Sequence, residues 1–198
     1  IDPKDLLTLI PRIAAMRALP GRPVISVADD VGYYGIYEQA LRDRGGMISF
    51  WIGCRAGCQV VGIESNGNVK GCLSLPSERQ GLETFVEGNL RKHKLKTIWE
   101  RENAFAYNRG FEVDQLQGFC AQCRFRDVCR GGCSCAAFGF SGNRFDNPLC
   151  FYRVAVENQR WDLIPDAEED LRQQPSHAAN GGCQCAGTCP SAPPVDPT

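Results

Sequence analysis

The chain has 198 residues, of which 43% are hydrophobic and 23% are charged, and its 22 Lys and Arg against 23 Asp and Glu give a formal net charge of -1. This length supports one modest hydrophobic core or slightly more. The balanced charge argues against nucleic acid or a membrane as a partner, because both need a basic face, and no run of about 20 apolar residues exists to span a bilayer.

The first predicted element is a helix near the start of the chain. Asp2 is a capping residue, and Pro3 takes the first helical position, where the missing N–H has no helical partner to lose. One helical stripe follows, formed by Leu6, Ile10, Ile13 and Arg17.

The next predicted element is a short buried strand. Val24–Ala28 is an apolar run that ends in Asp29 and Asp30, which is typical of a parallel strand feeding a loop. A helix followed by such a strand indicates an α/β barrel or layered fold. One such unit cannot close a sheet, and the chain begins with Ile1 rather than Met, so we expect it to be a fragment of a longer protein.

Residues 59–73 predict a β-hairpin. Asn66-Gly67 favours a two-residue type I′ turn, which would pair Ser65 with Asn68 and place Cys72 opposite Val61, about three residues from Cys58. The turn would thus fold distant cysteines toward each other. Strict alternation would point Cys58 and Cys72 to opposite faces, and a bulge at Gly62 would correct this.

A longer helix is predicted over residues 90–109. Asn89 is its expected cap, and four basic residues are expected to stay in solvent while an apolar side packs. The basic residues are Lys92, Lys94, Lys96 and Arg101, and the apolar ones are Leu95, Ile98, Trp99 and Phe105. A short helix over 156–174 and a disordered tail over 175–198, rich in Pro, Ala, Gly and Ser, complete the chain.

Twelve cysteines are the main compositional signal. None precedes Cys54, nine lie between Cys54 and Cys150, and three lie in the tail at Cys183, Cys185 and Cys189. A secreted disulfide scaffold would spread its cysteines through every loop, and no secretory signal precedes these. We therefore expect a reducing cytoplasm and metal ligation.

The spacing of eight cysteines indicates two four-thiolate sites. The pattern is Cys54-x3-Cys58-x13-Cys72, then Cys120-x2-Cys123-x5-Cys129-x3-Cys133, and finally Cys150. A [4Fe-4S] cluster takes four thiolates, and short spacings let one turn supply two of them. Spacing alone leaves zinc as a serious alternative, since C-x2-C is also its common motif, and disulfides rank third.

These residues closely resemble the SPASM domain of radical S-adenosylmethionine enzymes that modify peptides and proteins. The resemblance lies in "GCRAGCQVVGIESNGNVKGCLSLP", "EGNLRKHKLKTIW", "GFCAQCRFRDVCRGGC" and "FDNPLC", within residues 51–155. It implies two auxiliary [4Fe-4S] clusters with interleaved ligation. Cys54, Cys58, Cys72 and Cys133 would hold the first, and Cys120, Cys123, Cys129 and Cys150 the second. Whether Cys58 or an open iron site completes the first cluster varies within the family.

The same resemblance sets the expected fold, an α/β protein. Residues 1–50 would be the end of a partial (β/α) barrel, followed by a small α+β SPASM domain with a hairpin and helices around two clusters. Asp29 and Asp30 would then lie at the carboxyl end of a strand, where capping or solvation of a loop is the expected role. Tyr33, Tyr34 and Tyr37 are expected to pack in a core.

Several further residues are not assigned as metal ligands. Cys135 has no place in the pattern of eight and is interpreted as a small buried hydrophobe, while His93 and His177 lie in the basic helix and the tail. The three tail cysteines have nothing that preorganises them and stay unassigned. Arg124, Arg126 and Arg130 flank the second block, where a cluster would favour cations, although a plain surface role is nearly as well supported.

The motif that holds the catalytic cluster of radical S-adenosylmethionine enzymes, C-x3-C-x2-C, is absent. Cys54-x3-Cys58 begins like it, but Val61 stands at the third position. The chain alone is therefore expected not to start radical chemistry. S-adenosylmethionine and a third cluster would belong to an upstream domain, with a peptide or protein substrate and a flavodoxin or ferredoxin as partners. The alternatives are a separate noncatalytic iron–sulfur module, as electron carrier or peptide binder, and a zinc-stabilised structural domain.

Overall fold

The computed structural model describes residues 1–21, 24–29, 31, 33–42 and 50–165. They form two compact units, each described here by itself: unit 1 contains residues 1–54 and 112–165, and unit 2 contains residues 55–111. The predicted tail 175–198, residues 166–174 of the predicted last helix, Asp30, His177 and the three tail cysteines lie outside the described residues.

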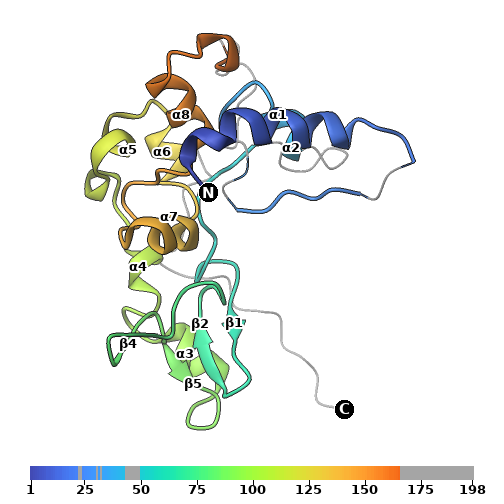
Figure 1. The fold of residues 1–198 in the computed structure, drawn as a ribbon. Helices are drawn as coiled ribbons and strands as arrows, with labels where there is room; N and C mark the ends of the chain where they lie inside the picture. Colours follow the sequence, from blue (N-terminus) through green and yellow to red (C-terminus); the bar gives the residue numbers. More distant parts are fainter. Residues whose placement is uncertain (22–23, 30, 32, 43–49, 166–198) are drawn as a thin grey trace. The chain divides into compact units, whose positions relative to one another are not determined.

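Unit 1 is helical in its described part (Figure 1). Its helices are α1 (Leu6–Arg17), α2 (Glu38–Arg42), α5 (Gly118–Gln122), α6 (Arg126–Cys129), α7 (Ser134–Ser141) and α8 (Phe151–Glu157), with 3-10 turns η1 (Pro3–Asp5), η2 (Val113–Gln115) and η3 (Trp161–Leu163). The predicted first helix is confirmed. The Asp2 side chain accepts a hydrogen bond from the Lys4 N–H, and Asp5 closes the capping box.

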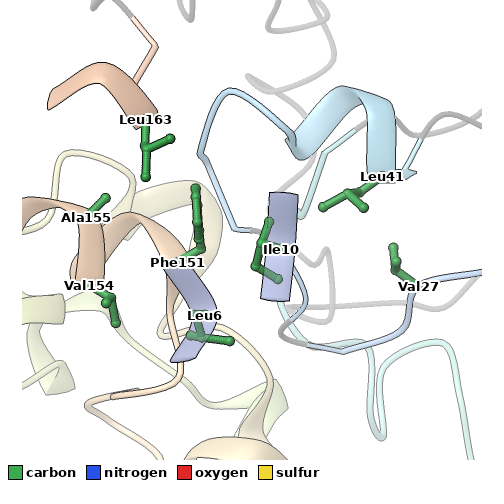
Figure 2. Packing of buried hydrophobic residues seen from close by; sticks show 8 residues of the cluster. All are labelled: Leu6, Ile10, Val27, Leu41, Phe151, Val154, Ala155 and Leu163. Atoms are coloured by element: carbon green, nitrogen blue, oxygen red, sulfur yellow. The ribbon is translucent and has the colours of Figure 1, made fainter. Parts of the chain in front are cut away.

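One hydrophobic core of unit 1 joins the start of the chain to its end. Leu6 and Ile10 of α1 lie among Phe151 and Val154 of α8, as Figure 2 shows. The full set of buried residues is Leu6, Ile10, Val27, Leu41, Phe151, Val154, Ala155 and Leu163. The α8 members of this core directly follow Cys150 in the sequence. The core therefore fixes the position of Cys150, the last predicted ligand.

The predicted strand over Val24–Ala28 is wrong. The segment forms no strand, and Val24 is 92% exposed, whereas only Val27 is buried. A parallel strand needs a neighbour to bond its backbone, and the described residues of unit 1 supply none. An apolar run alone is therefore not sufficient to predict a strand here.

Unit 2 contains small antiparallel sheets, which agrees with an α+β domain. Its three-stranded sheet has the order β1 (Gly62–Ile63), β2 (Asn68–Lys70), β5 (Gly88–Asn89), and β3 (Glu78–Arg79) pairs with β4 (Leu82–Glu83) (Figure 1). Val69 in the central strand is fully buried with Ile98, Ala104 and Phe105. The sheet is thus anchored on one side by the segment that follows it.

The hairpin forms, but its predicted turn and register are wrong. Gly62 pairs with Lys70 and Ile63 with Val69, and the Gly67 N–H donates to the Glu64 carbonyl at 2.8 Å. Only Gly67, with φ +93°, has a positive φ in this turn, whereas type I′ requires two such residues. The loop therefore has three residues, and the bulge lies at Gly67 rather than Gly62.

The predicted single helix over 90–109 is also wrong in extent. The chain forms α3 (Leu95–Glu100) and α4 (Ala106–Arg109), separated by a turn in which Asn103 and Phe105 have positive φ. Asn89 ends β5 rather than capping a helix directly, although its side chain accepts from the Arg91 N–H at 2.8 Å. The four basic residues are exposed and Ile98 and Phe105 are buried, as the pattern indicated, whereas Leu95 of the predicted apolar side is exposed.

Glu38 of α2 is a buried carboxylate in unit 1. One oxygen, Oε1, accepts from Arg42 Nε and from the Trp51 N–H, both at 2.7 Å, while Oε2 is buried without a hydrogen-bond partner. Burial raises the pKa of Glu38 to about 7, against the opposing effect of Arg42. The folded state therefore keeps a proton that the unfolded state releases near pH 4.5.

We expect this proton to make unit 1 less stable as pH rises from about 4.5 to about 7. In that window the folded state binds more protons than the unfolded state, so Glu38 lowers the free energy of unfolding by up to about 1.4 kcal/mol per pH unit. Glu38→Gln should remove that slope. Urea unfolding of both proteins at pH 5 and pH 8 measures the difference, and parallel pH profiles would contradict it.

Among the described residues, no helix is both long enough and apolar enough to cross a bilayer.

Candidate metal centre

The structure brings together the four cysteines of the predicted second set. Cys120 lies in α5, Cys123 directly follows that helix, and Cys129 ends α6, while Cys150 is the N-cap of α8. All four belong to unit 1, and the charge of each of Cys120, Cys123 and Cys150 acts on Cys129. The four thiols thus come from two short helices, α5 and α6, and from the start of α8.

Three of these four sulfurs accept a hydrogen bond from a backbone N–H group. Asn147 donates to Cys120 and Phe125 to Cys123, both at 3.4 Å, and Arg153 donates to Cys150 at 3.5 Å. The Gly132 N–H donates to the Cys129 carbonyl at 3.1 Å and lowers the pKa of the Cys129 thiol. Neutral thiols are weak acceptors, so these N–H donors suit sulfurs that carry negative charge, as metal-bound thiolates do.

The pKa values of the same thiols show what a metal must overcome. Burial raises the pKa of Cys120 to about 11 and also raises the pKa of Cys123, Cys129 and Cys150. Neighbouring thiolates add to the effect at Cys129 and Cys150. Without a cation the four thiols stay protonated at neutral pH, and a metal displaces these protons on binding.

The surroundings of this set fit an iron–sulfur group. The Asn147 side-chain nitrogen is buried without a hydrogen-bond partner, although its own backbone N–H serves Cys120. A buried donor of this kind is costly unless an acceptor is present, and a sulfur-rich cluster supplies acceptors. Tyr34 stacks on Phe125 at 4.1 Å between ring centroids, and Tyr152 packs edge-on to Phe125, which gives the set an apolar wall.

Charged side chains frame the set from one side. Arg124 lowers the pKa of Cys123 against the effect of burial, and its guanidinium lies over the Phe125 ring at 4.7 Å. Arg153 pairs with Asp146 at 2.9 Å, and the Asp146 carboxylate accepts from the Cys120 N–H at 3.4 Å. Arg126 is exposed and Arg130 is half-buried. Of the three flanking arginines, Arg124 thus has a described effect on a thiol.

The cysteines of the predicted first set are divided between the two units. Cys54 and Cys133 belong to unit 1, and Cys58 and Cys72 to unit 2. Cys133 is buried, its N–H donates to the Tyr33 hydroxyl at 2.8 Å, and its hydrogen bond with Cys135 and its burial raise its pKa. Gly53, next to Cys54, packs beside the Cys129 backbone.

Within unit 2, helix α4 holds the loop that presents Cys58. The Asn108 amide donates to the Ala56 carbonyl at 2.8 Å and to Cys58 Sγ at 3.8 Å. Arg109 donates to the Gly57 carbonyl at 2.6 Å. Asn108 is 5% exposed, so this loop is fixed by buried groups rather than by solvent contacts.

The hairpin brings Cys72 to the same loop. A Cβ at Gly71 would lie 2.7 Å from the Gly57 nitrogen, so the residues next to Cys72 and Cys58 are in backbone contact. Lys70 is buried and donates from Nζ to the Leu75 carbonyl at 2.5 Å and to Glu64 at 2.8 Å. These bonds hold the segment after Cys72. The predicted approach of the two cysteine segments is therefore observed, by a register the sequence did not indicate.

Four residues have supporting hydrogen bonds that the sequence reasoning did not predict: Tyr33, which was expected only to pack in a core, Asn108, Asp146 and Asn147. Each acts through a contact distant in sequence, as with Tyr33 and the Cys133 N–H. Only the "FDNPLC" segment offered a signal, because two of the four precede Cys150 within it. Cys135, predicted as a buried hydrophobe, is half-buried, and its sulfur lies 3.2 Å from the Cys133 sulfur. None of the nine described cysteines forms a disulfide.

Comparison with known proteins identifies one domain of the chain. A model of the SPASM iron–sulfur cluster-binding domain matches residues 54–124. The chain contains a SPASM domain. The resemblance drawn from the cysteine spacing is thereby confirmed, and the SPASM match covers all of unit 2 together with two of the four thiols gathered in unit 1.

The chain is also similar to parts of three curated relatives. It is 30% identical over 102 residues to the AdoMet-dependent heme synthase of Methanosarcina barkeri, covering 51% of this chain and 26% of the relative. It is 33% identical over 96 residues to the mycofactocin maturase MftC of Mycolicibacterium smegmatis (48% and 22%) and 32% identical over 95 residues to the PqqA peptide cyclase of Xanthomonas oryzae (48% and 24%). The chain spans about a quarter of the length of these curated relatives.

Proposed function

We propose that this chain is the auxiliary cluster-binding part of a radical S-adenosylmethionine enzyme that modifies a peptide or protein. The supporting observation is the group of four thiols in unit 1, Cys120, Cys123, Cys129 and Cys150, three of which accept a hydrogen bond from a backbone N–H. The name of the peptide cyclase supports a peptide substrate. The substrate, the bond formed and the whole enzyme's activity are parts of this proposal.

In this function the chain would hold two [4Fe-4S] clusters. Cys54, Cys58, Cys72 and Cys133 would ligate one, and Cys120, Cys123, Cys129 and Cys150 the other. Such clusters supply one-electron transfer. The protein's part is to exclude water with Tyr34 and Phe125 and to direct N–H groups at the sulfurs, which sets how readily an electron is accepted. S-adenosylmethionine and a third cluster would bind an upstream barrel, with a flavodoxin or ferredoxin as reductant in the cytoplasm.

The relative named as a heme synthase favours a second candidate, an enzyme whose substrate is not a peptide. The proposed cluster sites would be unchanged in that case, because they rest on the SPASM match and on the cysteines of this chain. Only the substrate class would differ. We favour the peptide because the PqqA peptide cyclase is named for one.

The test is the metal content of protein purified without oxygen. We expect about eight irons and eight acid-labile sulfides per chain, with broad absorbance near about 400 nm. Both clusters use described cysteines, so no other domain is needed for this result. Stoichiometric zinc and a colourless protein would instead establish a structural metal domain, and the proposed electron-transfer role would fall.

A further inference from the structure

The side-chain amide of Asn147 is a buried donor that the two ligand sets leave without a role. Asn147 is 1% exposed and lies three residues before Cys150. Its Oδ1 accepts the Leu149 N–H at 2.9 Å, whereas its Nδ2 is buried without a hydrogen-bond partner. Because a buried donor without an acceptor is unfavourable, we expect a bound group to supply the acceptor.

The hydrogen bond to Leu149 fixes the direction in which this amide points. A half-turn of the amide would place its NH2 group against the Leu149 N–H, and two donors cannot pair. Oδ1 therefore stays on the Leu149 side, and Nδ2 points to the opposite side. The backbone thus sets the orientation of the donor, whatever group is bound.

On that opposite side lies a segment of the second ligand set. A Cβ at Gly132 would lie 2.8 Å from Asn147 Nδ2 and 2.9 Å from Tyr33 Cε2, so only glycine leaves the amide in this place. The Gly132 N–H donates to the Cys129 carbonyl at 3.1 Å, and the Asn147 N–H donates to Cys120 Sγ at 3.4 Å. The amide is therefore held beside the segments that present two thiols of this set.

We propose that the Asn147 side-chain amide donates a hydrogen bond to a sulfur of the second cluster and raises the reduction potential of that cluster. The inference rests on the proposed function and deepens it by naming a residue that adjusts electron transfer without being a ligand. A [4Fe-4S] cluster gains negative charge on reduction, and hydrogen bonds to its sulfurs are among the factors that set its potential. A donor aimed at the sulfurs stabilises the reduced form more than the oxidised form.

The test is a redox titration of the full chain, purified without oxygen and followed by electron paramagnetic resonance. Asn147→Ala removes the donor, so the midpoint potential of the second cluster should fall by about 59 mV, a tenfold change for a one-electron couple. Asn147→Asp keeps the size and the acceptor for Leu149 but replaces NH2 by oxygen, so its potential should fall at least as far. Potentials equal to wild type in both variants would overturn the inference.

The matched control is Asn143, which makes the same turn contact in the same loop. Its Oδ1 accepts the Phe145 N–H at 2.9 Å, but its Nδ2 already has an acceptor, Gln117 Oε1, at 2.9 Å. Asn143→Ala should therefore leave the potential unchanged, and Asn143→Asp should lower it less than Asn147→Asp does. Equal falls at the two positions would show an effect of the loop or of charge alone, which would also overturn the inference.

A measurement with Asn147 unchanged covers the case in which both Asn147 variants lose the cluster. The Cys72→Ala chain should keep the second cluster, and asparagine labelled with ¹⁵N only in its side-chain amide should then show a ¹⁵N coupling to the reduced cluster in pulsed electron paramagnetic resonance. Absence of that coupling would end the inference alone if iron and sulfide are present. A wild-type chain without iron and sulfide would end both this inference and the proposed function.

Discussion

Cys123→Ala should lower the iron content of anaerobically purified protein from about eight to about four atoms per chain. Cys123 lies among the four thiols that converge in unit 1, and its sulfur acts electrostatically on both Cys120 and Cys150. Removal of one thiolate leaves three and opens an iron site, so most of that cluster's iron should be lost. Iron and acid-labile sulfide assays on wild type and variant measure the effect.

The matched variant is Cys72→Ala, in unit 2. It should remove the other half of the iron, so the double variant should contain almost none. Arg126→Ala changes an exposed residue of α6 and should keep the full content. Equal loss of both clusters in the single Cys123→Ala variant would contradict two independent sites, and unchanged iron would remove Cys123 from the ligand set.

The two four-thiol ligand sets stay predictions, whereas the cysteine spacing predicted the SPASM domain that the comparison confirms. It did so because a short spacing, such as that between Cys120 and Cys123, places both thiols in one helix and the residue that follows it, whatever the rest of the fold is. The groups that surround the sulfurs follow no such local rule. Asn147 and Tyr33 reach their cysteines through tertiary packing, which no pattern along the chain encodes.

The errors about secondary structure have specific physical causes. Asn66-Gly67 favours a tight type I′ turn, but a type I turn with Gly67 in the left-handed region also satisfies the sequence, and it shifts the register by one residue. With the observed register, extension of the ladder would place Cys72 opposite Val60, two residues from Cys58, so no bulge at Gly62 is needed for both to face one side. The strand predicted at Val24–Ala28 failed because apolar residues do not supply a pairing partner.

The contact between the Cys58 and Cys72 segments depends on the absence of a side chain at residue 71. A Cβ there would lie 2.0 Å from the Tyr107 hydroxyl oxygen, 2.7 Å from the Gly57 nitrogen and 2.9 Å from the Ala56 carbonyl carbon. Two of these three atoms are backbone, and α4 holds that loop through Asn108. The loop therefore cannot move aside without breaking buried hydrogen bonds.

Gly71→Ala should accordingly destabilise the protein by about 3 kcal/mol, at the upper end of the range for overpacking, and should reduce metal binding at Cys58 and Cys72. The matched control is Gly139→Ala in α7, where a Cβ meets nothing within 4 Å. That change should stabilise the protein by about 0.5–1 kcal/mol, because alanine favours the helix over glycine. Urea unfolding and iron assays on both variants decide the question. If the two variants were equally stable, the close approach of residues 57 and 71 would be wrong, and with it the structural basis for placing Cys58 and Cys72 in one ligand set.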